Sequence, residues 1–166
     1  MPEDHHEVTA EERDALLAGF LDSPEGRRWR DDEDAQDVAQ LAIDFGADYN
    51  HGGPLRWSPV VVEIFMTDWL TRKVTREAQF FTRVADVLRD WVQYAGRRQG
   101  VPAEPLREAV EAVGHYRKEM LDAAGDPDAW GPAKTVAVAA LEANVDLTDR
   151  DAVEDFMKRY NDGLAA

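Results

Sequence analysis

The stretch RWSPVVVEIFMTDWLTRKV, residues 56–74, restricts the possible folds of this chain more than any other part of the sequence. Its three consecutive valines, together with Ile64, Phe65 and Trp69, are side chains that are common in strands. The apolar run is shorter than the about 18 residues expected of a membrane-spanning helix. The choice is therefore between a strand and a buried helix.

Two features favour the helix. Ser58-Pro59 is a typical helix start, because a side-chain acceptor precedes the proline that the first turn tolerates. At about 100° per residue, Glu63, Thr67 and Thr71 fall on one narrow polar stripe, and apolar residues cover most of the remaining circumference. Such a helix is normally buried, so we predict a central helix over about residues 59–72.

Asp68 departs from this pattern, because it projects beside Val61, Ile64 and Phe65 and away from the polar stripe. A buried carboxylate has to be paired, hydrogen-bonded or protonated, and Arg72, one turn later, is the expected partner. Two interpretations stay open: an internal structural ion pair, or a carboxylate that lines a ligand pocket beside Arg72.

The rest of the chain also carries helix signals. Capping residues and Gly or Pro breaks predict further helices that begin at Thr9, within residues 31–34, and at Thr75, Pro105, Pro132 and Thr148. No segment alternates with a period of two for long, and no internal repeat is evident. The predicted fold class is all-α, with a single compact domain of about seven helices around the 59–72 helix.

Length and composition agree with one globular domain. The 166 residues can bury a hydrophobic core, and we predict a flexible tail over residues 1–8 followed by a helical domain over residues 9–163. Without cysteine, neither disulfides nor a thiolate metal site is possible. The acidic start MPEDHHEV is unlike a secretory signal, no membrane contact is predicted, and a cytoplasmic location is the default expectation.

The net charge of −15 argues against a nucleic-acid partner, which requires a basic surface. Acidic and basic residues number 15 and 4 in residues 1–55, 5 and 8 in residues 56–100, and 14 and 7 in residues 101–166. The basic middle segment either neutralises its acidic flanks within the fold or forms an anion-binding patch. The patch would be centred on Arg72, Lys73, Arg76, Arg97 and Arg98.

The sequence contains no Gly-rich phosphate loop, nucleophile elbow or HExxH motif. Asp37, Asp44 and Asp48 follow one side of the second predicted helix, but the Glu-x-x-Glu or Glu-x-x-His sets of metal-binding bundles are missing. A solvated face is therefore predicted for these aspartates. We expect no cofactor and no metal site.

Two hypotheses about function follow. The first is a non-catalytic interaction or regulatory module, with a protein partner or a second copy of the chain, because catalytic motifs are absent and charge is segregated. The second is a small-molecule binding protein or enzyme for an anionic ligand, with a pocket where the NHGGPLRW loop, the end of the 59–72 helix and AWGPAK converge. Its candidate residues are His51, Arg56, Trp57, Asp68, Arg72 and Lys134.

The segments RWSPVVVEIFMTDWLTRKV, DPDAWGPAK and VDLTDRDAVEDFMKRYN resemble blocks of an uncharacterised actinobacterial protein family, over roughly residues 10–163. In some of its members the helical region accompanies an N-terminal, cysteine-rich SEC-C-type zinc motif. That zinc site does not carry over, because this chain has no cysteine. The resemblance implies one all-helical domain and transfers no functional residue.

Overall fold

The structure is a computed structural model that describes residues 7–126, 139–140, 142–146 and 148–164. Helices connected by short turns make up this part of the chain, and no strand occurs in it. The all-helical prediction is therefore confirmed, and the expected number of about seven helices is close. The elements are α1 (Ala10–Asp22), a 3-10 turn (Arg27–Trp29), α2 (Glu33–Tyr49), α3 (Pro59–Ile64), a π-helical turn (Phe65–Trp69), α4 (Leu70–Lys73), α5 (Ala78–Gln99), α6 (Ala103–Ala124) and α8 (Arg150–Leu164).

Several helix ends lie where the sequence predicts them, because the signals are local. The Thr9 side chain accepts a hydrogen bond from the Glu12 amide at 3.1 Å, and Asp32 and Ser58 cap α2 and α3 in the same way. Gly100 ends α5 in the left-handed conformation, with φ +67°, which favours glycine. These caps set the helix ends through local interactions that do not depend on tertiary packing.

Three predicted starts are wrong by one to three residues. α6 begins at Ala103, two residues before the predicted Pro105. α5 begins at Ala78 instead of Thr75, because residues 74–77 form an extended link and Val74 is buried. Thr148 does not cap α8, because its hydroxyl donates to Asp146. Asp149 takes the capping role instead and accepts hydrogen bonds from two backbone amides of the first turn.

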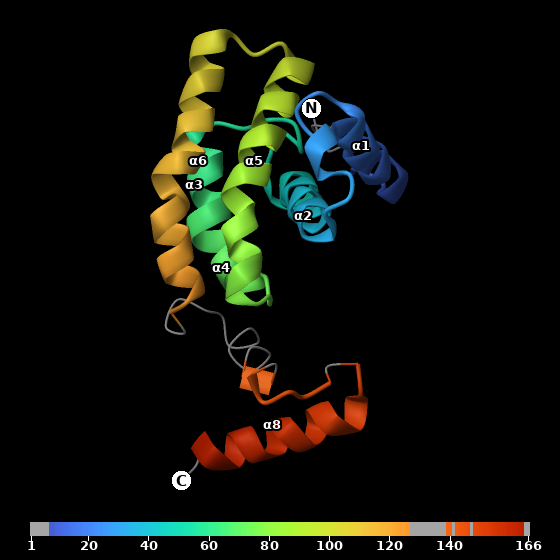
Figure 1. The fold of residues 1–166 in the computed structure, drawn as a ribbon, viewed down its shortest axis with the longest axis vertical. Coiled ribbons are helices and arrows are strands. Elements are labelled where there is room, and N and C mark those ends of the chain that lie inside the picture. Colours follow the sequence, from blue (N-terminus) through green and yellow to red (C-terminus); the bar gives the residue numbers. More distant parts are fainter. Residues whose placement is uncertain (1–6, 127–138, 141, 147, 165–166) are drawn as a thin grey trace, which may run out of the picture.

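α5 lies at the centre of the bundle, between α6 on one side and α2 on the other (Figure 1). Its contact with α6 is close at Gly96, where an added Cβ atom would lie 2.4 Å from Leu106 Cδ1. On the face toward α1, Trp91 is fully buried and its ring centre lies 5.3 Å from that of Phe20. The largest fully buried side chains of α5 are Phe81, Leu88, Trp91 and Tyr94.

α3, the π-helical turn and α4 form one unbroken helix, named the 59–73 helix below, which packs against α6. Val62, Phe65, Met66 and Leu70 are fully buried on its inner side. On its outer side, however, Val60 is 62% exposed and Ile64 is 45% exposed. The prediction of a helix buried over most of its circumference is therefore corrected: one face is buried and one is open.

The π-helical turn explains which face is buried. It adds one residue to a turn, so the residues after it are rotated by about 100° relative to an uninterrupted α-helix. Thr71, predicted to lie on the polar stripe, is 1% exposed as a result. Its hydroxyl donates to the carbonyl oxygens of Thr67 and Asp68, which satisfies the buried oxygen atom within the helix.

α8 lies apart from the bundle in Figure 1, and none of its residues from Arg150 to Tyr160 is buried. The predicted helix that starts at Pro132, with Trp130 before it and Lys134 in its first turn, lies outside the described residues. No helix within the described residues is long and apolar enough to cross a membrane.

Candidate functional site

The predicted pocket residues are placed in different environments. His51 and Arg56 are exposed in the loop between α2 and α3. Trp57 is 9% exposed, and its indole nitrogen donates to the Pro54 carbonyl oxygen at 2.7 Å. The Trp57 side chain thus holds this loop against the core and is not presented to a ligand. Lys134 lies outside the described residues.

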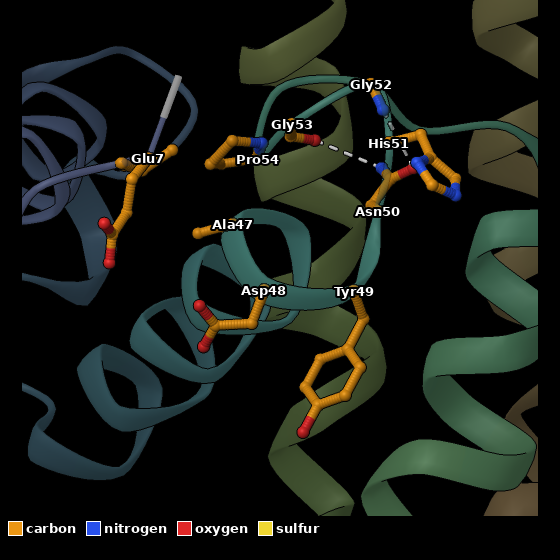
Figure 2. Close-up of a pocket in the computed structure, with 10 residues that line it drawn as sticks. Glu7, Ala47, Asp48, Tyr49, Asn50, His51, Gly52, Gly53 and Pro54 are labelled. Atoms are coloured by element: carbon orange, nitrogen blue, oxygen red, sulfur yellow. Dashed lines mark hydrogen bonds between the residues drawn. The ribbon is translucent and has the colours of Figure 1, made fainter. Parts of the chain in front are cut away.

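A hollow of about 710 Å³ lies between this loop, the end of α2 and the residues before α1. Figure 2 shows the Glu7 and Asp48 carboxylates on one side of the loop and the His51 ring on the other. His51 is therefore not oriented by Asp48, as an acid–base pair would require. Asn50 shapes the loop, because its amide nitrogen donates to the carbonyl oxygens of Gly53 and Arg56.

Asp68 and Arg72 form the expected ion pair, with 2.9 Å between the carboxylate and the guanidinium. The expectation that Asp68 is buried is wrong, since its side chain is 55% exposed. The reason is the open face of the 59–73 helix: Asp68 follows Val60 and Ile64 at intervals of four residues and shares their exposure to solvent. A pair with this exposure contributes little to stability.

A groove of about 380 Å³ lies between α2 and the 59–73 helix, and we name it the apolar groove. It brings together the end of α2, the first residue of the following loop and the outer side of the 59–73 helix. The residues that line it are Phe45, Tyr49, Asn50, Val61, Ile64, Asp68, Trp69, Arg72 and Lys73.

Aromatic rings form the floor of the apolar groove. The ring centre of Trp69 lies 5.5 Å from that of Phe45 and 5.8 Å from that of Tyr49, in both cases edge to face. Phe65 stacks on Trp69 from the buried side at 5.8 Å. Pairs of this geometry are favourable beyond their burial, so the rings support one another although Tyr49 itself is 59% exposed.

Polar groups lie at the rim of the groove. Asn50 stands at one end, and Asp68, Arg72 and Lys73 follow along the 59–73 helix. The indole nitrogen of Trp69 is buried and has no hydrogen-bond partner among the described residues. The groove therefore combines an apolar floor with a polar rim, where Lys73 lies beside the Asp68–Arg72 ion pair, and an apolar centre with a polar rim is the usual anatomy of a binding surface.

The aspartates on α2 are exposed, as the sequence predicts, since the side chains of Asp37, Asp44 and Asp48 are 54%, 36% and 52% exposed, but they also form ion pairs. Arg13 on α1 binds Asp44 at 3.0 Å and Asp48 at 2.8 Å, so it joins the two helices. These two carboxylates raise the pKa of Arg13 through their hydrogen bonds. Within the described part of the chain, no group of three or more histidine or carboxylate side chains could hold a metal ion.

The predicted cationic patch is mostly used within the fold. Arg76 pairs with Asp34 and Asp37 on α2, and Arg97 pairs with Glu25. These contacts agree with the interpretation that the basic middle segment neutralises an acidic flank. Since Arg97 donates to it, the pKa of the Glu25 carboxyl is lowered.

Comparison with known proteins adds no functional information. No family model matches the chain, no curated protein matches it, and no solved structure matches it. The resemblance to an actinobacterial family therefore stays a prediction.

Proposed function

We propose that this protein is a non-catalytic interaction module that binds an amphipathic helix in the apolar groove. The observation that carries the proposal is the distribution of exposed apolar side chains. Four large ones are exposed within the described residues, and three of them, Tyr49, Val60 and Ile64, lie in the groove or one turn beside it. Scattered apolar residues need no explanation, whereas a cluster of them at a groove marks a binding surface.

The shape of the groove supports a helical partner. A groove floored by aromatic rings accepts the apolar stripe of a helix, whose anchors recur every three or four residues. Ile64 and Val61 on one wall and Tyr49 on the other would contact such anchors. Arg72 and Lys73 at the rim favour a partner with acidic residues beside its stripe.

The test uses nuclear magnetic resonance on the full chain with a panel of amphipathic helical peptides, some with acidic and some with basic flanks. We expect acidic-flanked peptides to shift the signals of Tyr49, Ile64 and the Trp69 indole N–H, because these groups line the groove. Basic-flanked peptides are the matched control and should bind more weakly.

Two outcomes contradict the proposal. One is that no peptide shifts the groove signals. The other is that phosphorylated metabolites bind at Arg72 and Lys73 while peptides do not, which would favour the hypothesis of an anionic ligand.

A further inference from the structure

Arg98 differs from the other arginines of α5 in its partner. The other three pair with carboxylates: Arg83 with Asp32, Arg89 with Asp86 and Arg97 with Glu25. Arg98 pairs with no carboxylate of the described residues, and its Nη1 atom donates a hydrogen bond to the Tyr94 hydroxyl at 2.9 Å. Because a guanidinium has five N–H donors, Arg98 keeps donors for a ligand.

The guanidinium of Arg98 is oriented by a buried side chain. Tyr94, one turn earlier on α5, is 2% exposed, and its hydroxyl accepts the hydrogen bond. α1 passes close by at Gly19, where an added Cβ atom would lie 2.7 Å from the Tyr94 hydroxyl oxygen and 3.8 Å from Arg98 Nη1. The guanidinium thus lies between a buried phenol and α1, although the residue as a whole is exposed.

Arg98 lines a pocket of about 490 Å³, which we name the Arg98 pocket. It lies where α1, the loop between α2 and α3 and the C-terminal end of α5 meet. Pro54, labelled in Figure 2, belongs to the part of the loop that forms one wall. No residue lines both this pocket and the apolar groove, so the two are separate sites.

The lining of the Arg98 pocket places an apolar wall beside this cation. Ala15 and Leu16 of α1 and Pro54 and Leu55 of the loop form the wall. Leu16 and Leu55 are partly buried and pack against the hydrophobic core, so the core supports the wall from behind. The volume is in the range of small-molecule sites, which combine an apolar lining with a few placed polar groups.

This arrangement selects the chemistry of the ligand. A planar guanidinium binds a carboxylate through two parallel hydrogen bonds, and an apolar wall favours a hydrocarbon chain that leaves water. The Glu12 carboxylate also lines the pocket. A ligand with one negative charge therefore fits better than one with two, because a second charge adds repulsion from Glu12.

We propose that the Arg98 pocket binds a small monocarboxylate with a short aliphatic chain. Arg98 binds the carboxylate, and Leu16 and Leu55 contact the chain. This site is independent of the proposed function of the apolar groove, so either proposal can fail without the other.

The test is a titration of the full chain with hexanoate, followed by nuclear magnetic resonance. We expect hexanoate to shift the side-chain N–H signal of Arg98 and the methyl signals of Leu16 and Leu55, because these groups line the pocket. Hexanol has the chain without the charge, and acetate has the charge without the chain. Each should bind at least about tenfold more weakly than hexanoate, because each loses one of the two contacts.

A substitution tests the cation directly. Arg98→Gln should raise the Kd for hexanoate about tenfold or more, because it removes the charge-assisted hydrogen bonds. The matched control is Arg117→Gln on α6. Arg117 is also exposed, forms no ion pair among the described residues and does not line the pocket, so its loss should leave the Kd unchanged.

A second substitution tests the pocket without changing any charge. Ala15 is exposed on α1 and lines the pocket, so Ala15→Phe should fill the space and also raise the Kd about tenfold or more. Ala18→Phe is the matched control, because Ala18 is exposed on the same helix and lies outside the lining.

Three results would overturn the inference. Hexanoate could leave the signals of Arg98, Leu16 and Leu55 unchanged, hexanol could bind as tightly as hexanoate, or Arg98→Gln could bind hexanoate like the wild type. Circular dichroism confirms that each variant is folded. If Arg98→Gln fails to fold, Ala15→Phe decides, and unchanged binding to that variant would overturn the inference equally.

Discussion

α5 and the 59–73 helix are both rich in apolar residues, but they meet the solvent in different ways. Charged and polar residues interrupt the sequence of α5, and yet its apolar stripe is completely covered, with Trp91 and Leu88 fully buried. The 59–73 helix looks more hydrophobic in sequence, and yet Val60 and Ile64 remain exposed. Apolar content therefore does not predict burial. What decides it is how many neighbouring elements surround a helix.

The largest effect of a substitution on stability is expected in α5, whose apolar stripe is covered. Trp91→Ala should lower the free energy of unfolding by about 3–5 kcal/mol, because the fully buried ring packs against Phe20 and Tyr94. Denaturant titration measures the loss. A change below about 1 kcal/mol would show that α5 is not the centre of the core.

A smaller, pH-dependent effect is expected at the ion pair between Arg97 on α5 and Glu25. Arg97 lowers the pKa of Glu25, so the pair stabilises the folded state above the unfolded-state pKa of Glu, about 4.3, and this contribution is lost as the pH falls through the folded-state value. Glu25→Gln should therefore destabilise the protein at pH 7 and have little effect at acidic pH.

Unfolding measured for the wild type and Glu25→Gln at neutral and at acidic pH checks the sign. The matched control is Glu111→Gln, whose carboxylate lies 3.8 Å from Arg107 and is 70% exposed. A difference between Glu25→Gln and the wild type that does not depend on pH would contradict the assignment of the pair.

The buried and exposed faces of the 59–73 helix can be compared directly. Met66→Ala removes a fully buried side chain and should cost about 2–5 kcal/mol. Ile64→Ala, two residues earlier, removes a side chain that is 45% exposed and should cost less than about 1 kcal/mol. If thermal unfolding shows that Met66→Ala and Ile64→Ala lower the stability equally, the face of Ile64 is covered within one chain.

The smallest effect is expected at the ion pair on the same open face. Asp68→Asn should change the free energy of unfolding by at most about 0.5 kcal/mol, because both partners of the i, i+4 pair are half exposed. Thermal melting is a sufficient measurement. A sharp fall in the melting temperature would restore the interpretation of Asp68 as an internal structural group.

The helix ends marked by a side-chain cap or by a terminal glycine could be predicted, because each depends on a few adjacent residues. Thr9, Ser58 and Gly100 act through their own backbone and the next turn, so one sequence is enough to find them. The excess of acidic residues in residues 1–55 and of basic residues in residues 56–100 also predicts ion pairs between these two segments. Arg76 and Arg97 form such pairs.

Features that depend on distant segments could not be predicted. The bridge from Arg13 to Asp44 and Asp48 requires α1 and α2 to be packed side by side. The exposure of Asp68 depends on which sides of its helix are occupied by neighbours. Of the candidate pocket, the structure places Asp68 and Arg72 in one groove, and it separates His51 and Trp57 from them.

The π-helical turn has a consequence for how related chains should be compared with this one. A five-residue turn at Phe65–Trp69 is equivalent to a single inserted residue in an ordinary helix. A relative that lacks the inserted residue would align with one gap inside the helix, and its residues after the gap would keep the orientation seen here. A relative of the same length with a regular α-helix would align without a gap, but its equivalent of Thr71 would be rotated by about 100° and face outward. An ungapped alignment over a regular helix therefore marks relatives that present different side chains to the groove.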